Sequence, residues 1–118
     1  MRKEVVQQGF ILLGKPYKLG ARGPEAFDCS GLVYYIFQRI GLTLPFMTEG
    51  LLRQGYSISG DRVQEGDLVF FKNIKEFHVG IMINKQEFIH ASTRRGVVID
   101  TIKASYWKRS LIGFKSVL

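Results

Sequence analysis

The chain has 118 residues with a formal net charge of +7, and 46% of its residues are hydrophobic. This length and composition predict a single globular domain, residues 1–118, and exclude a disordered chain. No run of 18 apolar residues occurs, so no membrane-spanning helix is expected. The single cysteine excludes an intramolecular disulfide.

Basic residues are scattered singly along the chain, apart from Arg94-Arg95 and Lys108-Arg109. Such a surface is either simply solvated or attracts a polyanion such as cell wall, nucleic acid or an anionic membrane. No zinc-finger spacing, basic heptad or aromatic RNA-binding signature accompanies the charge. Sequence-specific nucleic-acid binding is therefore not expected.

The first half of the chain shows helical patterns. Residues 4–13 could suggest a signal peptide, but glutamines interrupt the apolar run and no small-residue cleavage site is present. The segment therefore predicts the first helix of the domain. Glycines and prolines predict a loop over 15–27. Asp28 then fits an N-cap, and the apolar spacing that follows predicts a helix over 29–40. A short helix is expected around 48–54.

The second half of the chain shows strand patterns. Short apolar or alternating runs, separated by glycine or polar residues, predict strands. They span residues 68–71, 79–83, 88–91, 97–102 and 112–117. Helices first and strands afterwards predict an α+β fold with an antiparallel sheet.

Cys29 falls in the first turn of the helix that Asp28 caps. The partial positive charge of a helix N-terminus lowers a thiol pKa, and the thiolate is the nucleophilic form of cysteine. The unpaired amides of the same turn can face an oxyanion. The alternative is that Cys29 is a small buried residue with a structural role at the helix start. Residues 28–31 alone do not distinguish a reactive cysteine from a structural one.

The two histidines, His78 and His90, lie on consecutive predicted strands. A three-residue turn at 84–86 places them on one face of the sheet as diagonal neighbours. His90 could then hold Nδ1 of His78 and leave Nε2 for Cys29. The alternatives are two polar residues on half-exposed strands, or a zinc site with Cys29. No short ligand spacing is present, so no metal is expected.

Several motifs occur in the order and spacing that are typical of the NlpC/P60 cysteine peptidases. Members of this family cut cell-wall peptides. The chain resembles the family over nearly its whole length. The matching segments are Gly14 to Gly20, Asp28-Cys29-Ser30-Gly31-Leu32-Val33, Gly41-Leu42 to Leu44-Pro45, Gly66 to Phe71, His78-Val79-Gly80-Ile81, and Phe88-Ile89-His90-Ala91-Ser92. The family's aromatic residue and second glycine are missing from residues 18–21.

The resemblance implies a papain-like core, in which N-terminal helices carrying the cysteine pack on an antiparallel sheet carrying the histidines. It implies a triad of Cys29, His78 and His90. It also implies that Tyr17 donates to the oxyanion or substrate, while Asp28 and Ser30 contact the substrate's amino end. For Asp28, a plain N-cap remains an equal alternative.

The activity implied by the resemblance is hydrolysis of peptidoglycan stem peptides between D-Glu and a diamino acid, through a thioester and without a cofactor. Such an enzyme would act as a monomer in the periplasm or cell wall, reached by an export route that this sequence does not identify. A lipid acyltransferase is an alternative, although those relatives are circularly permuted and here Cys29 precedes His78. An inactive wall-binding module is a third.

Overall fold

Six antiparallel strands form one sheet in the computed structural model, which describes residues 1–118. The strand order across the sheet is β1-β6-β2-β3-β4-β5. The predicted α+β fold with an antiparallel sheet is confirmed. The elements in chain order are α1 (Arg2–Ile11), α2 (Cys29–Arg39), α3 (Thr48–Leu51), β1 (Tyr56–Ile58), the 3-10 helix η1 (Gly60–Arg62), β2 (Leu68–Lys72), β3 (Phe77–Met82), β4 (Glu87–Ser92), β5 (Gly96–Thr101), α4 (Ser105–Ser110) and β6 (Leu111–Ser116).

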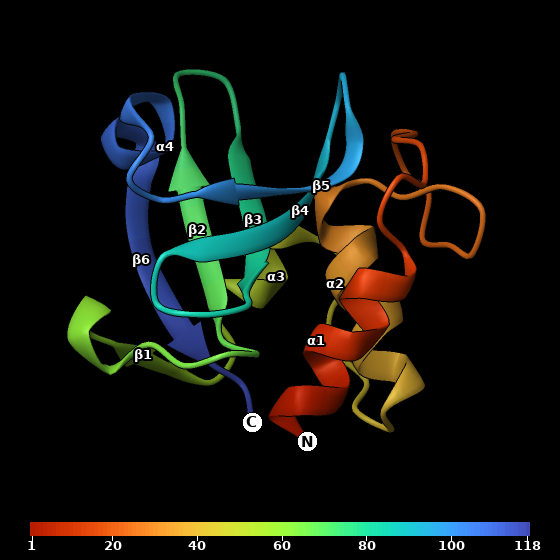
Figure 1. Ribbon diagram of the computed structural model, residues 1–118, viewed down its shortest axis with the longest axis horizontal. Helices are drawn as coiled ribbons and strands as arrows, with labels where there is room; N and C mark the ends of the chain where they lie inside the picture. Colours follow the sequence, from red (N-terminus) through yellow and green to blue (C-terminus); the bar gives the residue numbers. More distant parts are fainter.

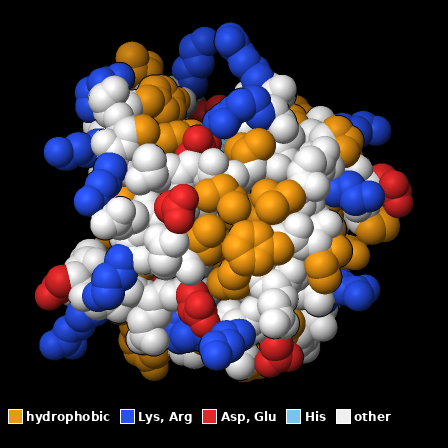
Figure 2. Space-filling model, viewed as in Figure 1, with side chains coloured by type: hydrophobic (Ala, Val, Ile, Leu, Met, Phe, Trp, Pro, Cys, Tyr) orange, Lys and Arg blue, Asp and Glu red, His pale blue; other side chains and the backbone are white.

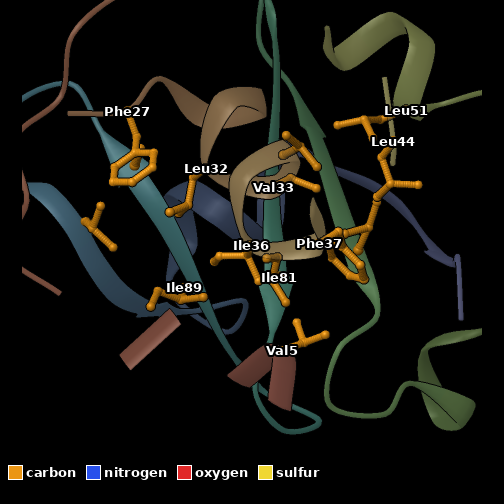
Figure 3. Close-up of a cluster of buried hydrophobic side chains, with 14 of the residues drawn as sticks. Val5, Phe27, Leu32, Val33, Ile36, Phe37, Leu44, Leu51, Ile81 and Ile89 are labelled. Atoms are coloured by element: carbon orange, nitrogen blue, oxygen red, sulfur yellow. The ribbon is translucent and has the colours of Figure 1, made fainter. Parts of the chain in front are cut away.

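Helix α2 packs across β3 and β4, with α1 alongside it (Figure 1). Its buried stripe comes from the helical spacing of Leu32, Val33, Ile36 and Phe37. In Figure 3 these side chains lie in the same cluster as Ile81 and Ile89 of the sheet. Burying a side chain of this size contributes roughly 1.5–3 kcal/mol. This packing fixes α2, and with it Cys29, against the sheet.

The register between β3 and β4 is the one that the sequence predicted. Ile81 pairs with Ile89, and the Ile83 amide donates to the Glu87 carbonyl at 3.0 Å. The turn between them therefore holds the three residues 84–86, and the Asn84 side chain accepts hydrogen bonds from two of the following amides. His78 and His90 consequently share one face of the sheet.

Strand β1 and helix α4 are among the elements that were not predicted from the sequence. Strand β1 has only three residues and forms by pairing with β6, which lies about sixty positions away in the chain. Helix α4 has six residues, too few for helical periodicity to be recognised. Trp107 of this helix packs against Phe71 of β2, with the ring centroids 4.7 Å apart. Both elements thus depend on distant residues.

Arg2 joins the beginning of the chain to its last strand. Its Nη1 donates to Oδ1 of the buried Asp67 at 2.7 Å, and its Nη2 donates to the Ser116 hydroxyl at 3.3 Å. Both ends of the chain therefore lie at the same edge of the molecule (Figure 1). None of the helices is long and apolar enough to cross a membrane.

Candidate active site

Cys29 is the first residue of α2 and is partly buried. Its Sγ lies 3.7 Å from the Thr48 hydroxyl at the start of α3. Burial raises the pKa of the thiol, and this effect outweighs the Thr48 hydroxyl and the Val79 and Ser30 amides, which act to lower it. The prediction of a lowered pKa is therefore wrong, because the helix start is packed against the sheet.

The same contacts place Cys29 beside the strand that carries His78. Helix α2 crosses β3, and the Val79 backbone is close enough to Sγ to act on the pKa of the thiol. Val79 directly follows His78 in β3. The nucleophile candidate and the base candidate thus come from adjacent elements that are far apart in sequence.

His78, His90 and Asp100 form a continuous hydrogen-bonded chain. His78 Nε2 lies 2.8 Å from His90 Nδ1, with the two rings perpendicular. His90 Nε2 lies 2.7 Å from Asp100 Oδ2. Arg95 in turn donates to Asp100 Oδ2 through Nη2 at 2.6 Å. The structure therefore brings together both predicted histidines and adds Asp100, which the sequence analysis missed.

Burial keeps both imidazole rings of the hydrogen-bonded His78–His90–Asp100 group neutral. Burial lowers the pKa of His78 to about 3, with a further lowering by His90. Burial also lowers the pKa of His90, although the hydrogen bond to Asp100 acts in the opposite direction. For Asp100, burial acts to raise the pKa, but Arg95 and His90 outweigh it and hold the pKa below its usual value. Asp100 is accordingly ionised at neutral pH.

An ionised carboxylate only accepts hydrogen bonds, so the positions of the ring protons follow from Asp100. His90 Nε2 must carry the proton that it donates to Asp100. The neutral His90 then accepts at Nδ1, so the proton between the rings belongs to His78 Nε2. This leaves Nδ1 of His78 as the unprotonated nitrogen. The predicted assignment is thus reversed, because the ring orientation of a histidine is not visible in a sequence pattern.

Trp107 covers this hydrogen-bonded chain. Its ring lies 5.4 Å from that of His78, at an interplanar angle of 30°, and 5.0 Å from that of His90. Such packing limits access of water to the rings and restricts their rotation. Nothing in the sequence near the histidines pointed to Trp107, because α4 reaches them only through the fold. Asp100 did have a signal, as the only carboxylate in its predicted strand.

The three other predicted site residues lie around Cys29. Asp28 is the N-cap, with Oδ1 accepting from the Gly31 amide at 2.7 Å and Oδ2 from the Gly20 amide at 2.9 Å. The buried Ser30 donates to the Phe46 carbonyl at 2.9 Å. Tyr17 is partly buried, and burial and the neighbouring acidic groups raise the pKa of its phenol. Tyr17 therefore keeps the proton that it would donate.

The candidate residues line two clefts. The Cys29 cleft, of about 550 Å³, is lined by Tyr17, Asp28, Cys29, Ser30 and Thr48, among others. The histidine cleft, of about 340 Å³, is lined by His78, His90, Arg94, Arg95 and Trp107, among others. Glu76 lines both clefts. No three His, Cys, Asp or Glu side chains are grouped so that they could hold a metal ion.

Comparison with known sequences identifies close relatives of this chain. The sequence pattern of the NlpC/P60 family matches residues 14–116. The probable endopeptidase p60 of Listeria grayi is 43% identical over 106 residues, covering 89% of this chain and 20% of that protein. Murein DD-endopeptidase MepS/murein LD-carboxypeptidase of Escherichia coli K12 is 40% identical over 111 residues, covering 92% and 59%.

A third relative, the gamma-DL-glutamyl hydrolase of Bacillus subtilis 168, is 36% identical over 116 residues, covering 94% of this chain and 28% of that protein. The chain thus spans between one fifth and about three fifths of the length of these three relatives.

Solved structures share the fold. An NlpC/P60 family protein from Bacillus cereus ATCC 10987 superposes with a TM-score of 0.94 at 26% identity, covering all of this chain and 40% of that one. The NlpC/P60 domain of the peptidoglycan hydrolase SagA gives a TM-score of 0.86 at 24% identity, covering 98% of both chains. The papain-like fold implied by the resemblance is confirmed. With the match over residues 14–116, these comparisons establish that the chain belongs to the NlpC/P60 family.

Proposed function

We propose that this chain is a cysteine peptidase that hydrolyses amide bonds in peptidoglycan stem peptides, with Cys29 as nucleophile, His78 as base and His90 as the residue that orients it. The observation that carries the proposal is the hydrogen-bonded chain from His78 to Asp100. It fixes the tautomers of both rings and leaves an unprotonated nitrogen on His78, in a strand packed against the helix of Cys29.

The reaction follows from these proton positions. Nδ1 of His78 takes the proton of the Cys29 thiol as Sγ attacks the carbonyl carbon of the substrate. The developing oxyanion is stabilised by the free amides of the first turn of α2 and by the hydroxyl of Tyr17. His78 then gives the proton to the leaving nitrogen, the C–N bond breaks, and a thioester with Cys29 remains. Water, deprotonated by His78, hydrolyses the thioester and restores the thiol.

The raised thiol pKa supports a base-assisted attack. A buried neutral thiol and a neutral imidazole are both favoured at rest. Proton transfer from Cys29 to His78 therefore accompanies attack instead of preceding it as a stable ion pair. The Thr48 hydroxyl, 3.7 Å from Sγ, can donate to the sulfur as its negative charge develops.

The substrate is proposed from the relatives. The names of the relatives include endopeptidases acting on murein and a gamma-DL-glutamyl hydrolase. We therefore assign the bond between D-Glu and the diamino acid of the stem peptide. The domain would act as a monomer on the extracytoplasmic cell wall, without an organic cofactor or a metal ion.

The test is digestion of purified peptidoglycan, with the products identified by mass spectrometry. Wild type should release fragments that end at D-Glu, whether or not EDTA is present. Cys29→Ala should lose this activity and keep the thermal unfolding temperature of wild type, because alanine is tolerated at a helix start. Residual activity of Cys29→Ala above about one per cent would remove Cys29 from the nucleophile role. Loss of activity in EDTA with recovery in zinc would overturn the metal-free mechanism.

A further inference from the structure

The proposed reaction places the two halves of the substrate on different sides of the site. The acyl half stays attached to Cys29, so it occupies the Cys29 cleft. The amine half departs when His78 protonates its nitrogen, so it lies on the side of His78. The histidine cleft opens beside His78, and Glu76 lines both this cleft and the Cys29 cleft. The residues that line the histidine cleft therefore indicate which chemical groups the amine half of the substrate carries.

Two arginines line the histidine cleft, and only one of them is already paired. Arg95 binds Asp100 through both terminal nitrogens, at 2.6 and 3.4 Å. Arg94 is exposed, and no ion pair or side-chain hydrogen bond of its guanidinium occurs in the protein. Its position is set by the backbone, since its amide donates to the Ser92 hydroxyl at 3.4 Å. Arg94 is thus a cation with no protein partner at the edge of the cleft.

The rest of the cleft is suited to a small polar group. The side-chain oxygen of Asn73 accepts from the amides of Lys75 and Glu76, which leaves its NH₂ group free to donate. Tyr106 and Trp107 form an aromatic wall, edge to face at 4.9 Å. A guanidinium and an amide donor next to an aromatic wall match an amino acid that carries a carboxylate. They do not match the apolar chain of a lipid.

We propose that the histidine cleft recognises the amine half of the substrate by a free carboxylate, and that Arg94 is the residue that binds it. This inference rests on the proposed function, because it assumes an amide substrate that is cut between Cys29 and His78. Guanidinium and carboxylate pair through two parallel hydrogen bonds, which gives Arg94 a geometric preference over a lysine at the same position.

The test uses two substrates that differ only in this carboxylate. They are the tripeptide L-Ala-γ-D-Glu-L-Lys with a free C-terminal carboxylate, and the same tripeptide with a C-terminal carboxamide. Wild type should show a kcat/KM about five- to tenfold higher for the acid, as expected for a charged hydrogen bond at a partly exposed site. Arg94→Gln should remove this preference by slowing the acid only. Arg94→Lys should keep part of it.

Arg62→Gln is the matched control, since Arg62 is an exposed arginine that lines neither cleft. It should keep the full preference for the acid. Equal rates of wild type on the two substrates, or a preference that persists in Arg94→Gln, would overturn the inference and leave the proposed function standing. Failure of wild type to cleave either substrate would overturn both.

A binding measurement separates recognition from catalysis. Trp107 is the only tryptophan and lines the histidine cleft, so its fluorescence reports on ligands there. In the Cys29→Ala background, the acid tripeptide should bind about five- to tenfold more tightly than the carboxamide. Adding Arg94→Gln should abolish the difference. Equal affinities in the Cys29→Ala protein would contradict the assignment of Arg94.

Discussion

Burial has opposite effects on the two reactive side chains of the site. It raises the pKa of the Cys29 thiol and lowers that of the His78 imidazole, because in each case it disfavours the charged form. Both changes favour a neutral pair over a thiolate–imidazolium pair. The resting protonation state is therefore set by the packing of α2 on the sheet, and it can be measured through the reactivity of the only cysteine.

The rate of alkylation of Cys29 by iodoacetamide should rise with pH. The thiolate is the reacting form, and a raised pKa means that its population is small at pH 6 and grows about tenfold per pH unit towards pH 8. Mass spectrometry of the alkylated protein over this range gives the rate constants. A plateau between pH 5 and 8 would instead show that the thiolate is already formed by an ion pair with His78.

Substitutions of His90 should separate orientation from proton transfer. His90→Asn retains a hydrogen-bonding group for His78 and should keep measurable activity, whereas His90→Ala should lose much more. His78→Gln should be nearly inactive, because an amide cannot take a proton at neutral pH. Initial rates of peptide hydrolysis at saturating substrate give the comparison. Wild-type activity in His90→Ala would leave a Cys29–His78 dyad.

Substitutions of Asp100 test the other end of the hydrogen-bonded group that contains His78 and His90. Asp100→Asn keeps an acceptor for His90 Nε2, and Asp100→Leu does not. The leucine variant should therefore be the less active of the two and should show a mixture of imidazole tautomers by nitrogen NMR. Equal activities would mean that Asp100 does not determine the proton positions.

At the scale of elements, the Asp28 carboxylate links the loop before α2 to the first turn of the helix. It accepts from the Gly20 amide on the loop side and from the Gly31 amide on the helix side. The backbone of the loop also reaches the same junction, with the Asp28 amide donating to the Ala21 carbonyl at 2.9 Å. The position of Cys29 thus depends on this cap as well as on the packing of α2 against the sheet.

Asp28→Ala should destabilise the fold by about 1–2 kcal/mol, the usual cost of losing an N-cap. Asp28→Asn keeps an acceptor oxygen and should lose less. Thermal unfolding followed by circular dichroism measures both variants without reference to activity, which matters because Asp28 lines the Cys29 cleft. Equal stability of the alanine variant and wild type would show that the cap contributes little.

Local patterns predicted the elements that hold the triad candidates. The helix of Cys29 follows from its cap and apolar spacing, and the placement of His78 and His90 on one face follows from the turn at 84–86. The roles of Asp100 and Trp107 in the candidate site were not predicted from the sequence. Asp100 reaches His90 across β4 and β5, through a register that the sequence analysis did not derive, and Trp107 lies in a helix too short to show a period.

At the scale of the whole molecule, the basic charge is spread over the surface. Figure 2 shows Lys and Arg side chains around the rim of one face, with hydrophobic side chains gathered near its centre. A net charge of +7 on a small domain attracts polyanions over distances comparable to the screening length. We expect this charge to hold the domain on anionic wall material without a specific site.

Raising the salt concentration should therefore weaken binding to whole peptidoglycan sacculi. The screening length falls from about 10 Å at 0.1 M to about 3 Å at 1 M salt. Cleavage of a short soluble stem peptide should change little over the same range. Sedimentation of the protein with sacculi and hydrolysis rates of the soluble peptide give the two measurements. Equal salt sensitivity of both would contradict a tethering role for the surface charge.

The place of β6 in the sheet has a consequence for how the chain reaches its folded state. This strand comes last in the sequence but lies inside the sheet, between β1 and β2. During synthesis on the ribosome, one edge of β2 stays open and β1 has no partner until residues 111–116 emerge. The helix with Cys29 and the hairpins with His78, His90 and Asp100 are made earlier, but the sheet that supports them is completed only by the final strand.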